Sequence, residues 1–348
     1  MPIPHHTYMQ QKQFSFSNKS TTCYFNASFG MIDEIADPAT TIFITDENII
    51  AGHRNRFDNR RVIVITPGEA NKTQATVDSI VTQLIQLEAD RKFTIVGVGG
   101  GVVTDLSGYA ASIYMRGLRF GFVPVSLLAM VDASIGGKNG VDVGPYKNLV
   151  GTIRQPDFLL YDSSFLSTLP QSEWINGFAE IIKHACIKDT ALFNELEKNS
   201  VDTYRSKQAL LNALIQRNAE IKCGVVMNDE FEKGERKLLN FGHTWGHAIE
   251  TKLNIPHGHA VAVGMVMACR LSEKINGFKE TDRVMALLKK YGLPVAAEAD
   301  TKEVFKVLKM DKKKDSGAMN YILLNNIGDA AVHRISIDEL EKMIEQCK

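Results

Sequence analysis

The period of the hydrophobic positions changes along the chain. In the first half, short runs of β-branched and aromatic residues alternate with helical patterns, whereas helical patterns predominate after about Leu160. Apolar strands separated by helices are typical of a parallel sheet that helices cover. The sequence therefore predicts an α/β domain with a mainly parallel sheet at residues 1–162 and a mainly α-helical domain at residues 163–348.

The predicted elements of the α/β domain are strands at 41–45, 61–66, 93–98 and 120–125 and helices at 73–90 and 103–115. In the second domain, helices are predicted at 171–188, 191–199, 207–223, 237–253, 260–276 and 281–291. Two short strands at 321–324 and 331–334 precede a final helix. We expect the functional site in the cleft between the domains.

A glycine cluster at 97–101 follows a predicted strand and precedes a predicted helix. Glycines there let the backbone approach a pyrophosphate, and the amides of a helix N-terminus donate to it. The spacing is not Gly-x-Gly-x-x-Gly, and a tight strand-to-helix turn would explain the glycines equally well. Asp46, Glu69 and Lys72 follow two other strands, and parallel strand ends meet at one edge. Together these positions predict a dinucleotide site in a Rossmann-like domain.

A glycine-rich segment, 131–139, contains Asp132 and Lys138, and Lys147-Asn148 follows shortly after it. Lysines beside flexible glycines favour phosphate as a point-charge partner. Solvated surface lysines are the ordinary alternative, but the apolar run 123–131 indicates partial burial.

His243 and His247 lie one helical turn apart, so both imidazoles leave the same helix face. His257 and His259 follow closely, and several imidazoles with a carboxylate are what a divalent metal such as zinc requires. Polar residues on a helix surface are the alternative for one such pair. Glu180 and Lys183 also share a face of an apolar helix, either as a structural ion pair or as groups that bind metal and substrate.

Composition excludes several other classes of protein. Lys+Arg and Asp+Glu balance at 40 each, so no global charge attracts nucleic acid or an anionic membrane. No apolar run reaches membrane-spanning length, and the polar N-terminus lacks the apolar core of a signal peptide. The five scattered cysteines are typical of reduced thiols, so we expect a cytoplasmic protein.

Several longer motifs resemble the 3-dehydroquinate synthases of the shikimate pathway of aromatic amino acid biosynthesis, which are sugar-phosphate cyclases. The resemblance extends from about Thr45 to Val332, and its motifs are 99–105, 114–117, 131–138, 147–148, 179–183, 239–247, 257–258 and 311–313. It implies a dehydroquinate synthase-like fold and a lyase that forms homodimers. It also implies two cofactors, NAD and a divalent metal, Zn²⁺ or Co²⁺.

The resemblance also implies a role for each matching position. The implied metal ligands are Glu180, His243 and His257. The implied NAD contacts are Asp46, Asn48, Glu69, Lys72, Gly100, Gly101, Asp105, Lys147 and Thr168. The implied substrate contacts are Lys138, Asn148, Lys222, Arg236, Asn240 and Lys312, with Arg116 reaching a phosphate in the neighbouring subunit. The implied catalytic groups are Asp132, Glu180, Lys183 and His247, of which His247 is the candidate for proton transfer.

The implied substrate is 3-deoxy-D-arabino-heptulosonate 7-phosphate, which has a carboxylate and a phosphate. Transient oxidation with NAD, elimination of phosphate, re-reduction and an intramolecular aldol closure would give 3-dehydroquinate. Lys222 and Arg236 favour this substrate, because sedoheptulose 7-phosphate and glucose 6-phosphate offer no carboxylate to them.

Three other functions remain open at this stage: another sugar-phosphate cyclase, a metal-dependent polyol dehydrogenase, and a catalytically silent NAD-binding or zinc-stabilised scaffold. The sequence departs from the family pattern at Val125-Ser126, Asn139, Asp142 and His259, which bears on the details of cofactor binding.

Overall fold

A computed structural model describes residues 9–144, 146–311 and 317–347. Contacts divide the chain into two compact units. The first comprises the chain up to Pro170 together with Gln208–Glu230, and the second comprises Gln171–Lys207 and the chain from Phe231 onward. The predicted boundary near Asp162 differs from this division mainly at helix α8 (Gln208–Asn228), which packs on elements of the first unit. Periodicity identifies such a helix but does not reveal which core it covers.

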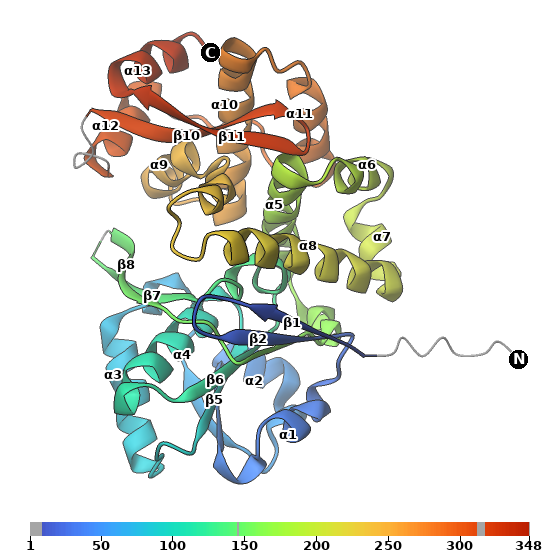
Figure 1. Ribbon diagram of the computed structural model, residues 1–348, viewed down its shortest axis with the longest axis vertical. Helices are drawn as coiled ribbons and strands as arrows, with labels where there is room; N and C mark the ends of the chain where they lie inside the picture. The colour runs from blue at the N-terminus through green and yellow to red at the C-terminus, as the bar shows by residue number, and fades with distance from the viewer. Residues whose placement is uncertain (1–8, 145, 312–316, 348) are drawn as a thin grey trace, which may run out of the picture. The chain divides into compact units, whose positions relative to one another are not determined.

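A seven-stranded sheet forms the centre of the first unit, in the order β1-β2-β9-β6-β5-β3-β4 (Figure 1). Every neighbouring pair is parallel except β1 and β2, which confirms the predicted mainly parallel sheet. Its strands are β1 (Gln10–Ser15), β2 (Ser20–Phe25), β3 (Thr41–Asp46), β4 (Arg61–Ile65), β5 (Thr94–Gly99), β6 (Arg119–Pro124) and β9 (Phe158–Leu160). The helices of this unit are α1 (Ile32–Ile35), α2 (Glu47–His53), α3 (Gln74–Gln86), α4 (Gly101–Ile113) and α8.

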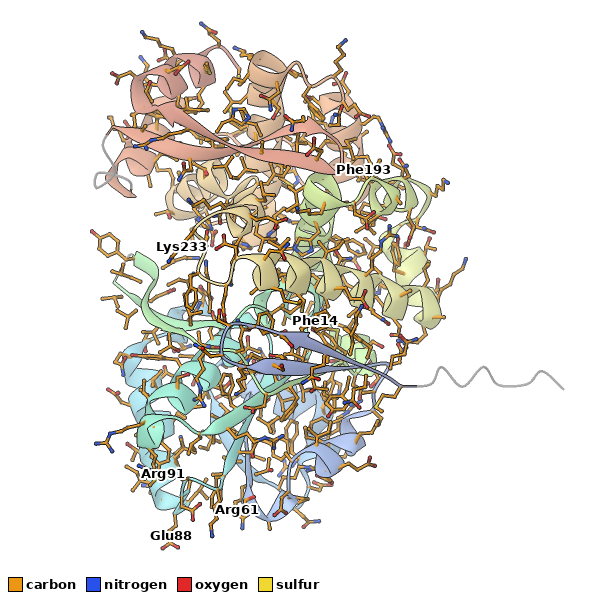
Figure 2. All side chains as sticks on the ribbon, viewed as in Figure 1. Phe14, Arg61, Glu88, Arg91, Phe193 and Lys233 are labelled. Carbon is orange, nitrogen blue, oxygen red and sulfur yellow. The ribbon has the colours of Figure 1, made fainter. Side chains whose placement is uncertain are left out.

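The buried strands and the edge hairpin differ in their sequence patterns. All six residues of β5 are buried, as expected for a central strand that helices cover on both faces. In contrast, β1 exposes five of its six residues, and Phe14, labelled in Figure 2, is its buried side chain. A mostly polar edge strand has no apolar run, which explains why the prediction did not include β1.

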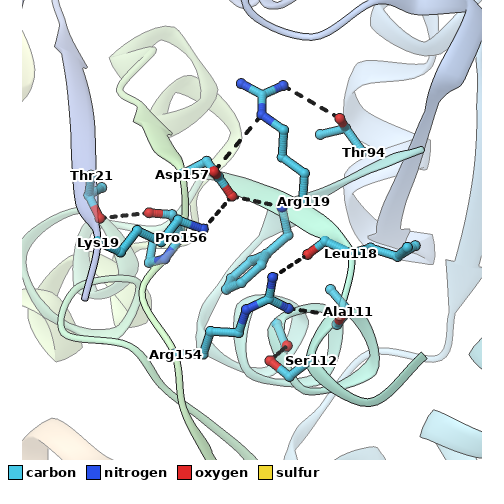
Figure 3. Close-up of polar contacts among 12 residues, drawn as sticks. Lys19, Thr21, Thr94, Ala111, Ser112, Leu118, Arg119, Arg154, Pro156 and Asp157 are labelled. Carbon is cyan, nitrogen blue, oxygen red and sulfur yellow. Dashed lines mark hydrogen bonds and ion pairs between the residues drawn. The ribbon is translucent and has the colours of Figure 1, made fainter. Parts of the chain in front are cut away.

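A short connector before β9 fixes the middle of the sheet (Figure 3). The Asp157 carboxylate accepts a hydrogen bond from the Lys19 ammonium at 2.6 Å and from the Phe120 backbone amide at 3.2 Å. The Arg154 guanidinium donates to the Leu118 carbonyl at 2.7 Å and to the Ala111 carbonyl at 3.1 Å. These bonds hold the exit of the antiparallel hairpin of β7 (Lys138–Val143) and β8 (Tyr146–Ile153) against the end of α4.

The second unit is mainly helical, as predicted (Figure 1). Its helices are α5 (Gln171–Lys188), α6 (Thr190–Lys198), α7 (Val201–Ser206), α9 (His243–Leu253), α10 (His257–Asn276), α11 (Thr281–Lys290), α12 (Thr301–Asp311) and α13 (Ile337–Glu345). Its one sheet among the described residues pairs β10 (Ala318–Asn326) with β11 (Asp329–Ser336). Helix α6 packs through Leu192, Phe193 and Leu196, and Phe193, labelled in Figure 2, lies beneath the Arg283 guanidinium.

The helix predicted at 237–253 is two elements. A 3₁₀ turn at Glu235–Asn240 precedes α9, and Gly242 between them has a positive φ of 80°. Glycine adopts that conformation without a Cβ clash, so it allows α9 to begin at His243. Within the described residues, no helix combines the length and the apolar character needed to span a bilayer.

We predict that Gly121→Ala destabilises the first unit by about 1–3 kcal/mol, the usual cost of overpacking. A Cβ at this β6 residue would lie 2.4 Å from the ring of Phe158 on β9, which is buried in the core. Gly224→Ala on α8 is the matched control, because nothing lies within 4 Å of its Cβ position. The control should gain about 0.5–1 kcal/mol from helix propensity. Urea unfolding of both variants measures the difference, and equal effects would contradict the packing described here.

Candidate active site

Polar groups gather at one edge of the first unit's sheet. Because β3 pairs in parallel with β4 and β5, their carboxyl ends share that edge, as predicted. Asp46 ends β3 and caps α2 by accepting the Ile49 amide at 3.0 Å, while burial raises the pKa of its carboxyl. Asn48 lies exposed in the first turn of the same helix. The Thr168 hydroxyl lies 2.8 Å from the His53 imidazole at the other end of α2.

The glycine cluster connects β5 to α4. A Cβ at Gly99 would lie 2.4 Å from the Val103 side chain, so this glycine is required by close strand–helix packing. Gly100 is the N-cap of α4 and Gly101 its first residue. A Cβ at Gly100 would meet nothing nearer than the Ser126 hydroxyl at 3.5 Å. The amides at the start of this thirteen-residue helix suit a phosphate group.

Lys72 is the centre of a buried polar network beside this turn. Its ammonium lies 2.6 Å from the Asp105 carboxylate and donates to the Asn148 amide oxygen at 2.6 Å. Burial raises the pKa of Asp105 to about 6 although Lys72 opposes the shift. Burial also opposes the charge on Lys72, but Asp105 and Glu69 outweigh it and raise the Lys72 pKa. Near pH 7 both groups are therefore ionised, and Asp105 takes up a proton when the pH falls through about 6.

The glycine-rich segment leads into the β7–β8 hairpin rather than a long loop. Asp142 on β7 accepts the Asn148 amide at 2.7 Å, and its own amide donates to the Lys72 carbonyl at 2.8 Å. The Lys147 ammonium lies 3.9 Å from the Glu69 carboxylate. Asp142 therefore holds Asn148 and Lys72 in place.

The other predicted substrate residues of the first unit lie in three places. The Lys222 ammonium on α8 lies 2.6 Å from the Asp132 carboxylate and donates to the Asp132 carbonyl at 2.7 Å. Lys138 is exposed at the start of β7. Arg116 is also exposed, in a turn where Met115, Arg116 and Gly117 have φ values of 48°, 66° and 120°. Left-handed backbone at two non-glycine residues is strained, which often marks a functional turn.

Three helices of the second unit bring a carboxylate and two imidazoles together. Glu180 on α5 is fully buried. Its Oε1 lies 3.6 Å from His243 Nε2 on α9 and 3.4 Å from His257 Nε2 on α10. Ligand atoms of these three residues all lie within 4.8 Å of one another, a spacing that a single divalent ion can occupy. His247, Glu250 and His257 form a second such group, which shares His257 with the first.

The orientation of the imidazoles fits a metal at the first group. His243 Nδ1 lies 3.2 Å from the Phe241 carbonyl, and His257 Nδ1 lies 3.1 Å from the Glu250 carboxylate. Each contact favours a proton on Nδ1, which leaves Nε2 as the metal-binding nitrogen. Burial lowers the pKa of His243 well below its usual range, and the Lys183 ammonium adds to the shift. Burial also opposes the charge on His257, but hydrogen bonds to Glu180 and Glu250 raise its pKa to about 9.

The remaining predicted residues of the second unit have contacts of their own. Lys183, one turn after Glu180 on α5, is buried and paired with the Glu180 carboxylate. The His247 ring is exposed, with its centroid 5.1 Å from that of His243. Asn240 donates to the Glu232 carboxylate at 2.6 Å, and Arg236 is 3% exposed. Lys312 lies outside the described residues.

Four residues with clear contacts to this chemistry had no assigned role in the sequence prediction. They are His53, Asp142, Glu232 and Glu250. Glu250 had the clearest signal, since it lies three residues after His247 and shares its helix face. The other three contact a residue of a different element: Thr168 for His53, Asn148 across the hairpin for Asp142, and Asn240 of the 3₁₀ turn for Glu232. No spacing rule identifies such partners.

Two family models and a relative match most of this chain. A family model described as the 3-dehydroquinate synthase N-terminal domain matches residues 62–176, and one described as the 3-dehydroquinate synthase C-terminal domain matches residues 177–314. A 3-dehydroquinate synthase of Methylacidiphilum infernorum (isolate V4) is 43% identical over 275 residues, which cover 77% of this chain and 75% of the relative.

Solved structures are similar as well. A 2-deoxy-scyllo-inosose synthase complexed with carbaglucose-6-phosphate, NAD⁺ and Co²⁺ is 26% identical, with a TM-score of 0.85 over 97% of this chain and 99% of that chain. A 2-epi-5-epi-valiolone synthase from Streptomyces hygroscopicus subsp. jinggangensis 5008, with NAD⁺ and Zn²⁺ bound, is 24% identical, with a TM-score of 0.84 over 97% of each chain. The similarity to the valiolone synthase shows that the two chains share a fold.

We predict that His243→Ala and Glu180→Gln each weaken Zn²⁺ binding by more than about 100-fold. Each variant removes a proposed direct ligand, and even residues that only orient a ligand contribute about 10–100-fold to metal affinity. His333→Ala, a partly buried histidine on β11, is the matched control and should bind Zn²⁺ as the wild type does. Competition with a chromophoric chelator measures the affinities. Wild-type affinity in both cluster variants would place the metal elsewhere.

We predict that Lys72→Met lowers the free energy of unfolding by about 3 kcal/mol at about pH 7.5, the scale for breaking a buried ion pair. This loss of stability should be smaller at about pH 5. The buried carboxyl of Asp105 has a raised pKa in the folded state, so its ionised form costs stability as pH rises, and protonation removes that cost. Lys72→Met/Asp105→Asn should be more stable than Lys72→Met at the higher pH. Urea unfolding at both pH values tests this, and a pH-independent loss would contradict the network described above.

Proposed function

This chain belongs to the 3-dehydroquinate synthase family, and on that basis we propose that it converts 3-deoxy-D-arabino-heptulosonate 7-phosphate to 3-dehydroquinate and phosphate. The enzyme is then an NAD- and metal-dependent phosphorus–oxygen lyase of the shikimate pathway. The observation that supports this most strongly is the buried Glu180 carboxylate facing the Nε2 atoms of His243 and His257. That donor set suits Zn²⁺ or Co²⁺.

The residues proposed for each cofactor all belong to a single unit. All nine candidate NAD contacts belong to the first unit, and the three candidate metal ligands belong to the second. When bound, the two cofactors supply a reversible hydride acceptor and a Lewis acid that polarises an oxygen of the substrate. The net reaction is then loss of phosphate, without a net change in the oxidation state of NAD.

The protein's own groups would bind and orient the substrate and move its protons. We assign the phosphate to Lys138, Asn148, Asn240 and Lys312, and the carboxylate to Lys222 and Arg236. His247 lies beside the two imidazole ligands, where a neutral ring can transfer a proton near pH 7. Lys183 holds the Glu180 carboxylate, and Asp132 holds Lys222.

Another sugar-phosphate cyclase activity is the second candidate, because the chain shares its fold with the 2-deoxy-scyllo-inosose synthase. The higher identity to the 3-dehydroquinate synthase, 43% against 26%, favours the first candidate. A polyol dehydrogenase would differ from both cyclases by accumulating NADH.

Turnover distinguishes these candidates directly. Metal-loaded protein with catalytic NAD and the heptulosonate phosphate should release phosphate and the carbocyclic product in equal amounts, without net NADH. Parallel reactions contain sedoheptulose 7-phosphate or glucose 6-phosphate. Turnover confined to one of these two sugars would establish the second candidate and refute the first.

Arg236→Ala tests the proposed carboxylate contact. The variant should lose about 1.5–3 kcal/mol of transition-state stabilisation, the scale of a charged hydrogen bond. The measurement is kcat/KM with the heptulosonate phosphate. Because Arg236 is buried, its removal also bears on stability, so the melting temperature and Zn²⁺ affinity of the variant serve as the controls. An unchanged kcat/KM would refute the assignment.

We also propose that the protein forms homodimers through the first unit. The β7–β8 hairpin exposes apolar side chains that a monomer would leave in water, among them Tyr146 at 59% and Leu149 at 66%. Met115, 43% exposed, adds to the apolar surface beside Arg116. In this proposal Arg116 reaches the phosphate bound by a second copy.

The five buried free cysteines and the balanced charge support a cytoplasmic protein that binds neither nucleic acid nor membrane.

Mixing two inactive variants tests the role of Arg116. Arg116→Ala retains its own metal site, and Glu180→Gln retains Arg116, so a mixed dimer regains one complete site. After subunit exchange, an equal mixture should recover on the order of one quarter of the wild-type activity, since half of the dimers are mixed. Unmixed variants are the controls. A mixture no more active than its components would refute a contribution from the partner.

A further inference from the structure

We propose that Glu250 is a positioning residue for the metal site: its carboxylate fixes the orientation and the tautomer of His257, so that Nε2 faces Glu180. This inference rests on the proposed function, since it assumes a metal bound by Glu180, His243 and His257. It adds a residue that has no role in the scheme proposed above, and we place its effect on the ring of His257.

The two nitrogens of His257 have different partners. Nδ1 lies 3.1 Å from the Glu250 carboxylate, and Nε2 lies 3.4 Å from the Glu180 carboxylate. A metal binds the neutral form of imidazole, which has one protonated nitrogen, and a carboxylate beside Nδ1 keeps that proton there. Nε2 then keeps its lone pair for the metal. Glu250 is 8% exposed, so little water competes for this hydrogen bond.

The packing of α9 against α10 fixes the distance between Glu250 and His257. A Cβ at Gly264 of α10 would lie 1.8 Å from the Gly242 carbonyl, and a Cβ at Gly246 of α9 would lie 2.9 Å from the Ala260 carbonyl. The two helices therefore approach to backbone contact, and glycine is required for that approach. As a result α9 contributes one metal ligand, His243, and also orients the ligand that α10 contributes.

A direct metal contact is the competing role for Glu250. Its carboxylate, His247 and His257 also lie close enough together to bind one ion. In that arrangement His257 would bind through Nδ1 and leave Glu180 outside the coordination sphere. The two roles differ in the ligand set, so the spectrum of a bound cobalt ion distinguishes them.

The experiment compares wild-type protein with Glu250→Gln and Glu250→Asp. Gln keeps the size of the side chain and loses its charge, whereas Asp keeps the charge. We expect Glu250→Gln to bind Zn²⁺ about 10–100-fold more weakly in a competition titration, the usual effect of removing a partner that orients a ligand. Its Co²⁺ absorption spectrum should match that of the wild type at saturation. Glu250→Asp should recover part of the affinity.

Two controls separate this role from a general loss of structure. Glu195→Gln removes another carboxylate of the second unit, one that accepts the Tyr204 hydroxyl at 3.1 Å, and should bind Zn²⁺ as the wild type does. NAD affinity should be unchanged in Glu250→Gln, because the proposed NAD contacts belong to the first unit. Two results would overturn the inference alone: wild-type Zn²⁺ affinity in Glu250→Gln, or a Co²⁺ spectrum that has lost a ligand. Absence of metal binding by the wild type would instead refute the proposed function.

Discussion

The second unit is organised around a carboxylate that is fully removed from water. Glu180 is 0% exposed, and an ionised group at such a position is costly unless cations or hydrogen-bond donors surround it. Lys183 from the same helix and two imidazoles from α9 and α10 surround it here. This requirement explains why α9 and α10 approach so closely and why both begin with a histidine. The Glu180 carboxylate and the two imidazoles, without Lys183, are also a donor set for a divalent metal.

The first unit also contains a buried charge pair, which joins several of its elements. Lys72 and Asp105 lie 2.6 Å apart beside the glycine turn, and the β7–β8 hairpin is bonded to both the Lys72 backbone and its side chain. The amides at the N-terminus of α4 favour an anionic ligand. In the function proposed above, each unit would hold one cofactor on helices and strands. The substrate contacts that we propose are divided between the two units.

The sequence predicted the features that depend on local pattern. The parallel strands and helix α5 with its Gln171–Lys188 bounds follow from periodicity. The grouping of Glu180 with His243 and His257 was implied by the family resemblance. Other features depend on tertiary contacts and have no such pattern. The polar edge strand β1 lacks an apolar run, α8 gives no sign of which unit it covers, and Asp142 acts on a residue across a hairpin. Glu250 lay within the histidine segment, but its partner His257 belongs to the next helix.

Anomalous diffraction at the zinc edge, from crystals grown with Zn²⁺, would locate the metal. We expect one strong peak within bonding distance of a Glu180 oxygen and of the Nε2 atoms of His243 and His257, at about 2.0–2.2 Å. His257 Nδ1 should remain hydrogen-bonded to Glu250. A peak bound by His247 and Glu250, or no peak near Glu180, would refute the metal site proposed for Glu180, His243 and His257.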